Sequence, residues 1–339
     1  MSGKNLELNN FWVLKMINDM SFFDNIENEN VCKAILKANS VIRPYKKIMV
    51  SISGGSDSDI LVDLMEKVRD ESQKIDYVFF DTGIEYYATK KHLNYLENRY
   101  NIKIQRIKSS KSIPMSCKQY GQPFISKFVS TEIYSLQLNG FKFEDKPYEK
   151  LIEEYPKCKS RIMWWCDMYS PQLSIRNFKY LKEFLIANPP TFKISAKCCE
   201  YSKKALAKNI LKKNKYELDV TGIRKSEGGV RSYKYKTCFS EKSNDYIATF
   251  MPLFWFNNDD KKYYNEFFKI QNSDCYTKYA LKRTGCACCP FSRSLEQELD
   301  MAEQFEPKIA NACKTIFKES YDYTQKYKKF KEEMRKCKK

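Results

Sequence analysis

Two sets of residues in this chain have types and spacing suited to chemistry, namely a glycine-rich loop and two cysteine clusters. The loop reads Ser53-Gly54-Gly55-Ser56-Asp57-Ser58 and follows the apolar run 48–52. Glycines let a backbone approach a phosphate closely, and a following helix offers unpaired N–H groups and a positive dipole end. The same residues also suit a plain turn before a capped helix. We therefore treat the loop as a candidate phosphate-binding site.

The clustered cysteines are candidate metal ligands. They are Cys198, Cys199, Cys286, Cys288 and Cys289. Four thiolates select zinc or an iron–sulfur cluster. The adjacent pair suits a cubane better than a zinc knuckle, because neighbouring thiolates can bind different irons. We expect a 4Fe–4S cluster on Cys198, Cys199, Cys286 and Cys289; zinc and unligated buried thiols are the alternatives, and Cys288 has no assigned role.

Composition limits the remaining chemistry. The 339 residues include a single histidine, His92, so a catalytic triad or a multi-histidine metal site would depend on that residue alone. Thirteen cysteines, with no export signal at the N-terminus, favour metal ligation or thiol chemistry in a reducing compartment. The 15% aromatic content excludes wholesale disorder, and no apolar run is long enough to span a bilayer. We expect a soluble protein of the cytoplasm, without membrane contact.

The elements around the loop predict an α/β fold. Apolar runs indicate strands at 48–52, 77–80, 102–107 and 218–223, with helical periodicity between the first three. This alternation predicts an α/β fold with a parallel sheet covered by helices on both faces. Helical and cysteine-rich elements follow towards the C-terminus. Loops that leave the carboxyl edge of such a sheet are where ligands bind.

Changes in composition suggest three parts. Residues 1–40 are expected to be a helical segment, and residues 41–240 the nucleotide-binding domain. An aromatic-rich insertion interrupts that domain at about 111–185. Residues 241–339 are expected to form a cysteine-rich region that ends in a docked, basic amphipathic helix from about residue 314.

Three motifs together resemble one superfamily. The loop 53–58 resembles the Ser-Gly-Gly-x-Asp-Ser loop of the PP-loop ATP pyrophosphatases. Asp81-Thr82-Gly83 after the next strand resembles the phosphoadenosine-phosphosulfate (PAPS) reductase branch, and the segment 221–231 looks like the Arg- and Glu-containing segment of that branch. The third match departs from the branch pattern, which has Ser where this chain has Gly228. The two cysteine clusters are similar to the 4Fe–4S site of assimilatory adenylyl-sulfate reductases.

The resemblance implies a Rossmann-like sheet, similar to that of the adenine nucleotide alpha hydrolases, which binds ATP with Mg²⁺ or a related adenine nucleotide. Gly54 and Gly55, with Ser53, Ser56 and Ser58, would hold phosphate. Asp57 would cap the helix or approach the metal ion. Asp81, Thr82 and Gly83 would lie near the nucleotide. Arg224 and Arg231 would neutralise phosphate or sulfate, since guanidinium groups bind such anions well.

Two reactions fit such a site. In the first, ATP adenylates an acceptor so that sulfur can be inserted; in the second, a cysteine attacks adenylyl sulfate or PAPS. The C-terminal Glu-Cys-Gly motif of the reductases is missing, although Cys337 stands in a basic tail. Residues 193–236 hold 13 basic and 4 acidic residues, interleaved with tyrosines, which favours a nucleic-acid acceptor. We therefore expect a sulfur-inserting enzyme, served by a sulfur-donor protein; the alternatives are a sulfonucleotide reductase and a non-catalytic nucleotide- and partner-binding protein.

Overall fold

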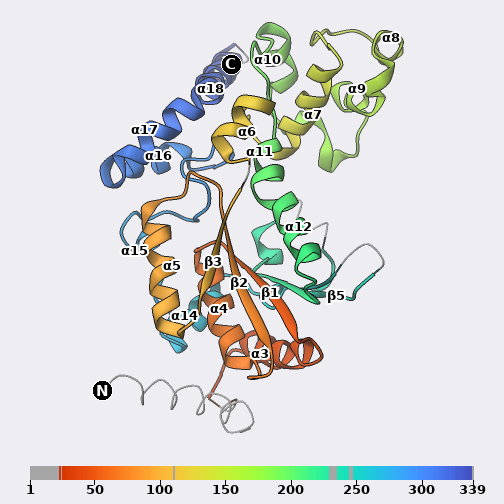
Figure 1. Cartoon of the computed structure of the whole chain (residues 1–339). Helices are drawn as coiled ribbons and strands as arrows, with labels where there is room; N and C mark the ends of the chain where they lie inside the picture. Colours follow the sequence, from red (N-terminus) through yellow and green to blue (C-terminus); the bar gives the residue numbers. More distant parts are fainter. Residues whose placement is uncertain (1–22, 24, 110, 229–234, 244–246, 338–339) are drawn as a thin grey trace. The chain divides into compact units, whose positions relative to one another are not determined.

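The computed structural model describes residues 23, 25–109, 111–228, 235–243 and 247–337 (Figure 1). The chain forms two compact units, and each is assembled from separate stretches of sequence. Unit 1 comprises residues up to Asp81, Glu85–Lys108 and Leu206–Gly285. Unit 2 comprises Thr82–Ile84, Ser109–Ala205 and the residues from Cys286 onwards.

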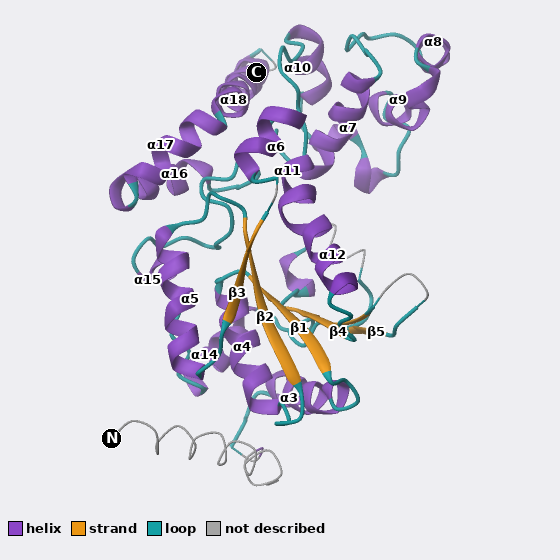
Figure 2. Ribbon diagram, in the orientation of Figure 1, coloured by secondary structure: helices purple, strands orange, loops and turns teal. Residues whose placement is uncertain are grey.

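Unit 1 contains a six-stranded sheet with the order β3-β2-β1-β4-β6-β5 (Figure 2). Every neighbouring pair is parallel except β5 and β6. The strands are β1 (Lys47–Ile52), β2 (Lys74–Asp81), β3 (Ile104–Lys108), β4 (Leu218–Thr221), β5 (Phe239–Ser240) and β6 (Ala248–Phe250). Its helices are α3 (Glu29–Ile42), α4 (Ser56–Val68), α5 (Tyr87–Tyr100), α12 (Ala205–Lys213, from Leu206 on), η5 (Lys225–Glu227), α14 (Asn258–Phe267) and α15 (Asp274–Thr277).

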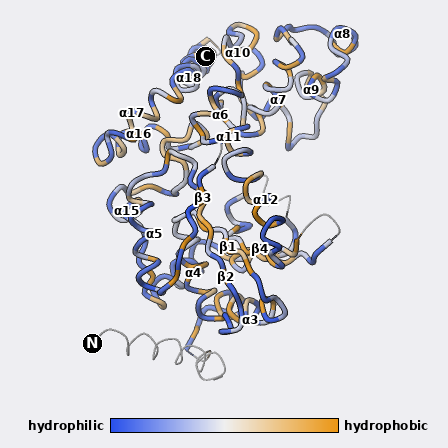
Figure 3. Tube along the Cα trace, viewed as in Figure 1, coloured by the Kyte–Doolittle hydropathy of each residue, from blue (hydrophilic) through white to orange (hydrophobic). Residues whose placement is uncertain are grey.

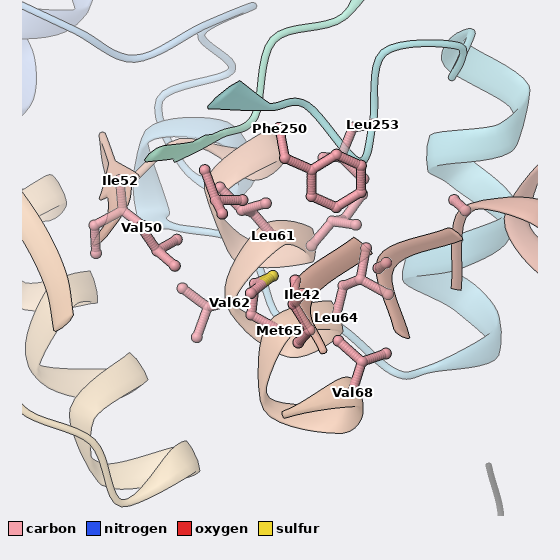
Figure 4. Packing of buried hydrophobic residues seen from close by; sticks show 14 of the residues in the cluster. Ile42, Val50, Ile52, Leu61, Val62, Leu64, Met65, Val68, Phe250 and Leu253 are labelled. Atoms are coloured by element: carbon pink, nitrogen blue, oxygen red, sulfur yellow. The ribbon is translucent and has the colours of Figure 1, made fainter. Parts of the chain in front are cut away.

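Alternating side chains of the strands pack on opposite faces of this sheet. Val50 and Ile52 of β1 join Leu61, Leu64 and other residues of α3 and α4 in the larger core (Figure 4). Met49 points to the other face, where Leu206, Ile210 and Leu211 of α12 pack against a cluster with Val78 and Phe80. Hydrophobic stretches follow the strands of the sheet (Figure 3). The predicted parallel sheet with helices on both faces is therefore confirmed.

The order of the strands creates a switch point between β1 and β4. From β1 the chain runs outward through β2 to β3 and then returns to the other side of β1 as β4. Ligands of open α/β sheets bind at such a point, outside the carboxyl ends of the strands. The loop 53–58 follows β1 and the segment that begins with Gly222 follows β4, so the topology brings two of the predicted motifs to this edge.

Unit 2 is mainly helical. Its helices are α6 (Ile113–Tyr120), α7 (Lys127–Leu138), α8 (Tyr148–Glu154), η1 (Pro156–Cys158), α9 (Lys159–Trp165), η2 (Pro171–Leu173), η3 (Ile175–Asn177), α10 (Leu181–Ala187), α11 (Lys197–Cys199), η4 (Glu200–Lys204), α16 (Leu295–Phe305), α17 (Pro307–Ile316) and α18 (Lys318–Lys336). Trp164, Trp165 and Phe184 are fully buried in its core, and Tyr327 and Phe330 of α18 pack there too. The predicted docked basic helix is thus present.

Two further predictions concern the ends and the environment of the chain. Of the helices expected within residues 1–40, the later one corresponds to α3, whereas the earlier one lies outside the described residues. Among the helices that the structure describes, none combines the length and the apolar character needed to cross a membrane.

Candidate nucleotide loop and thiol cluster

The glycine loop is held in a fixed conformation at the end of β1. Gly54 has a φ of +67°, and a Cβ there would lie 2.7 Å from the Cγ2 atom of Thr89. A side chain at this position would therefore be both strained and crowded. The amide of Ser53 donates to Oγ of Ser58 at 2.8 Å, and the two hydroxyl oxygens lie 3.0 Å apart. These bonds close the loop over the first turn of α4.

The second glycine makes room for two side chains that cover the start of α4. A Cβ on Gly55 would lie 2.7 Å from Oγ1 of Thr284 and 3.0 Å from the hydroxyl of Tyr276. That hydroxyl accepts a hydrogen bond from the amide of Ser56 at 3.2 Å and another from the amide of Thr284. The phenol oxygen thus accepts the hydrogen bond of an N–H group that could otherwise bind a phosphate.

Asp57 is the acidic centre of the loop. The N-cap residue of α4 is Gly55, which makes no side-chain hydrogen bond. Of the two roles expected for Asp57, capping of the helix is therefore wrong. Its Oδ1 atom lies 3.1 Å from Nε of Arg224 and 3.0 Å from Nζ of Lys261. The carboxylate is therefore paired with two cations at the position where the resemblance expects a nucleotide and its metal ion.

Arg224 reaches this place from the segment after β4. The packing of that segment on α4 is close, since a Cβ on Gly222 would lie 3.4 Å from the carbonyl oxygen of Asp57. The Nη1 atom of Arg224 donates to Ser226, Asn258 and a backbone carbonyl, which fixes the guanidinium. Next to it, the ammonium of Lys225 lies 5.0 Å from the ring centroid of the exposed Trp255. Arg231, the other predicted anion ligand, lies outside the described residues.

The Asp81-Thr82-Gly83 motif is divided between the two units. Asp81 ends β2 in unit 1, with Nζ of Lys90 at 4.0 Å. It also lines a cavity of about 150 Å³, whose lining includes Lys90 and Arg106 and no residue of the loop 53–58. Thr82 and Gly83 belong to unit 2, where Oγ1 of Thr82 lies 3.6 Å from the sulfur of Cys286. The expected role of the motif at the nucleotide remains a prediction.

The only histidine has a structural environment. Nε2 of His92 lies 2.8 Å from Oδ1 of Asp59, and both side chains are buried between α4 and α5. The imidazole also stacks on Tyr95. Burial raises the pKa of Asp59, and the hydrogen bond to His92 opposes that shift. This pair links α4, which follows the loop, to α5.

The thiols of unit 2 gather more closely than the sequence clusters alone predicted. Cys198 interacts with Cys117 of α6 as well as with its neighbour Cys199, and the hydrogen bond with Cys117 is the main cause that raises the pKa of Cys198. The bond to Cys198, together with burial, raises the pKa of Cys199. Burial raises the pKa of Cys289 to about 12, and the charges of Cys286 and Cys199 add to that shift. All four predicted ligands are thus electrostatic neighbours.

The four cysteine thiols are of a type that binds zinc or iron, but their side chains are not arranged around a common metal position. Within the described ranges, no three Cys, His, Asp or Glu side chains are arranged to hold a metal ion. Positive charge is nevertheless at hand, since Lys127 and Lys203 act to lower the pKa of Cys199. Lys197, which precedes Cys198 in the sequence, lies over the rings of Tyr134 and Tyr201. Cys288 is buried and shares a hydrogen bond with Cys313, which raises the pKa of Cys313.

The basic stretch 193–236 is divided between the two units. Its first part belongs to unit 2 and the part from Leu206 on belongs to unit 1. Tyr216, one of the tyrosines of this stretch, is buried, and its hydroxyl donates to Asp76. Tyr233 lies outside the described residues. By contrast, Lys212 and Lys213 are exposed on α12, on the side away from its packed residues.

The sheet with a glycine loop at its switch point defines an α/β domain of the Rossmann-like class. Part of this domain matches a known family. Residues 47–135 match the family described as the phosphoadenosine phosphosulfate reductase domain. This segment is therefore similar to PAPS reductase domains, and it includes the first two motifs; the third motif lies beyond the matched residues.

One curated relative and several solved structures are also similar to this chain. An uncharacterized protein of Methanocaldococcus jannaschii is 36% identical over 116 residues, which are 34% of this chain and 22% of that protein. The chain thus spans less than a quarter of the relative's length. Among solved structures, the PAPS reductase of Candida auris is 12% identical with a TM-score of 0.42, covering 84% of this chain and 96% of that one. The U34-tRNA thiolase NcsA of Methanococcus maripaludis, with its 4Fe–4S cluster, is 13% identical with a TM-score of 0.36, covering 88% and 79%.

Several residues of these sites could not be found in the sequence. Lys261, Tyr276 and Thr284 reach the loop from segments more than 200 residues away, and no motif marks them. Cys117 and Cys313 are lone cysteines in the sequence, without a partner at ligand spacing. Only the unusual number of cysteines hinted that some of them would join the cluster.

Proposed function

We propose that the chain is a PP-loop enzyme of the cytoplasm that binds ATP at the loop 53–58 and adenylates an acceptor for sulfur insertion. The acceptor proposed is a nucleic acid, and the sulfur comes from a donor protein. In this proposal Cys198, Cys199, Cys286 and Cys289 hold a 4Fe–4S cluster, with zinc as the alternative. Such a cluster would supply an iron site for sulfur or for electron transfer.

The geometry of the loop carries this proposal. Gly54 and Gly55 form a loop without side chains between β1 and α4, at the switch point of the sheet, where the phenol of Tyr276 accepts the hydrogen bond of the Ser56 amide. Arg224 and Lys261 bring two positive charges to the same place. The triphosphate of ATP can replace Asp57 as the partner of Arg224 and Lys261. The carboxylate of Asp57 is then free to contact a magnesium ion.

The proposed reaction has two balanced steps. An oxygen of the acceptor attacks the α-phosphorus of ATP, the bond from that phosphorus to the bridging oxygen breaks, and pyrophosphate leaves. A sulfur nucleophile from the donor then attacks the acceptor carbon, and AMP leaves with the original oxygen. Arg224 and Lys261 would stabilise the negative charge of the departing pyrophosphate.

The match of residues 47–135 to the PAPS reductase domain supports a second candidate, reduction of a sulfonucleotide. This reaction needs a nucleophilic thiol that can reach the sulfur of the substrate. Cys337, which directly follows α18, is exposed and stands beside Arg335 and Lys336.

One assay separates the two candidates. Anaerobically purified protein is incubated with ATP and sulfide as the sulfur source, with and without RNA or DNA, and AMP and pyrophosphate are quantified. We expect both products in equal amounts, with stimulation by the nucleic acid. Release of sulfite from PAPS or adenylyl sulfate with a thiol reductant, and loss of that activity in Cys337→Ser, would replace this proposal with the reductase.

A further inference from the structure

A group of tyrosines and lysines lies next to the cysteine pair of unit 2. It consists of Lys111, Tyr120 of α6, Tyr134 of α7, Lys197 of α11 and Tyr201 of η4, which we call the tyrosine–lysine patch. All five residues are half-buried, so each keeps part of its surface open to solvent. The helices α6, α11 and η4 pack against one another, which holds the patch together.

Two of its rings form a stacked platform. The centroids of Tyr120 and Tyr201 are 4.6 Å apart, with an angle of 28° between the ring planes. The ammonium of Lys111 lies 4.9 Å from the first centroid and 4.7 Å from the second, and it also donates to the hydroxyl of Tyr120. Stacked aromatic faces with a cation beside them are the elements with which proteins bind unpaired bases.

A second cation completes the patch. The ammonium of Lys197 lies 5.8 Å from the ring of Tyr201 and 5.9 Å from that of Tyr134. Across the part of the chain that the structure describes, no carboxylate forms a salt bridge with Lys111 or Lys197. The patch therefore presents two positive charges that no described acidic group neutralises, which suits it to an anionic ligand.

The backbone under the patch is unusual. The residues Glu200–Lys204, which include Tyr201, form a π-helical turn directly after Cys198 and Cys199. Such turns are rare in helices and frequently mark functional sites. The hydroxyl of Ser202 donates to the carbonyl of Cys198 at 2.6 Å and links this turn to the cysteine pair.

We propose that the tyrosine–lysine patch binds an unpaired base of a single-stranded nucleic acid and the phosphates beside it. The base packs on the outer face of Tyr201 and so extends the stack that this ring forms with Tyr120, and the ammonium groups of Lys111 and Lys197 contact the phosphates. This inference rests on the proposed function and names the place where its acceptor binds. Since Tyr201 is two residues from Cys199, the bound strand lies on the same helical stretch as the candidate thiolates.

Binding of short fluorescent oligothymidine and oligouridine tests this proposal by anisotropy, without ATP. Tyr201→Ala should weaken binding by about 10-fold, because stacking of one base contributes on that order, and Tyr201→Phe should keep most of it. Lys111→Ala with Lys197→Ala should lower the salt slope of log affinity by about 1.4 units. Lys179→Ala is the matched control, since that lysine also lies over a tyrosine ring, 5.4 Å away, elsewhere in unit 2.

Each outcome decides the question. Unchanged oligonucleotide binding in Tyr201→Ala and in the double lysine variant overturns the patch, and so does a loss of ATP binding instead of oligonucleotide binding. If Tyr201→Ala does not fold, the double lysine variant and Tyr201→Phe carry the test. Oligonucleotide binding that depends on the patch, without any AMP release, would refute the proposed function and leave the binding site standing.

Discussion

The loop of unit 1 and the thiols of unit 2 differ in how the chain builds them. The loop is one stretch of six residues, and β1 and α4 on either side fix its shape. The thiols come from α6, α11, the loop before α16 and α17, which are far apart in the sequence. The geometry of a site built from one stretch of sequence can be predicted from its motif. For a site assembled from distant segments, the sequence identifies only some of the residues. The two sites should therefore respond differently to substitution.

The largest expected effect is on metal in unit 2. Cys198→Ser or Cys289→Ser should remove the metal from anaerobically purified protein, because a cubane that loses one thiolate loses an anchoring bond to iron. Wild-type protein should contain roughly four irons per chain and absorb broadly near ~400 nm. Iron and zinc are measured by elemental analysis.

Cys158→Ser is the control for this experiment. Cys158 is buried in the same unit, but its sulfur contacts a backbone carbonyl of Tyr155 and no other cysteine among its described contacts. Equal iron in all three variants, or one zinc and no iron in the wild type, would refute the cluster.

A second effect concerns the loop alone. Gly55→Val places a side chain where Thr284 and Tyr276 already lie and where a phosphate must approach. We expect a loss of ATP affinity of about 100-fold or more by calorimetry, since both the phosphate contacts and the loop conformation are affected. Iron content in unit 2 should not change.

Gly285→Val provides the matched control, because a Cβ at that position meets open space. Thermal unfolding of both variants checks that the fold persists. Normal ATP binding by a folded Gly55→Val protein would show that the loop is only a turn.

A third prediction uses pH to act on unit 1. Asp219 lies in β4, and its Oδ1 atom is buried without a hydrogen-bond partner among the described residues. Burial raises the pKa of Asp219 to about 7. The unfolded chain ionises this group near pH 4, so its contribution to folding is retained below that pH and is lost as the pH rises towards 7.

The measurement is the free energy of unfolding at pH 5 and at pH 8. Asp219→Asn should stabilise the protein relative to wild type more at pH 8 than at pH 5, by a difference on the order of 3 kcal/mol at most. Asp300→Asn, an exposed site in unit 2, is the control and should show no such difference. Parallel pH curves for wild type and Asp219→Asn would contradict the buried carboxylate.

The smallest effect concerns the side chain that covers the loop. Tyr276→Phe releases the amide of Ser56 from its hydrogen bond to the phenol. The free amide can then bind phosphate without giving up a partner, and we expect ATP to bind about 5-fold more tightly. Tyr263→Phe also loses a hydroxyl that accepts one backbone bond, from Glu27, and should leave ATP affinity unchanged. Weaker ATP binding in Tyr276→Phe would mean that the phenol itself contacts the nucleotide.

The same contrast explains how far the sequence could be interpreted. β1, β2 and β4 were predicted within a few residues, because buried parallel strands are short apolar runs between turn residues. The short strands β5 and β6 were not predicted, since two or three residues carry no periodicity. The glycines of the loop and the position of Arg224 were predicted from the order of the motifs along the chain. The topology of the sheet brings motifs that follow β1 and β4 close together.

What escaped prediction depends on long-range packing. Lys261 has the appearance of any surface lysine until α14 packs against α4 and brings it to Asp57. Tyr216 appeared in the sequence as one more tyrosine in a basic stretch, but its neighbours in the fold bury it. In both cases the side chain's role is set by elements that the sequence alone does not place.

The helix α18 also dictates an order of events during synthesis. Its Tyr323 and Tyr327 donate to the carbonyls of Asn188 and Lys179, and both rings contact Phe184 in the core of unit 2. Translation adds about 5–20 residues per second, so this core stays open for several seconds after α10 has left the ribosome. Cys198 and Cys199 are likewise made well before Cys286 and Cys289. Any metal that requires all four thiolates can thus be loaded only after the segment with Cys286 and Cys289 has been made.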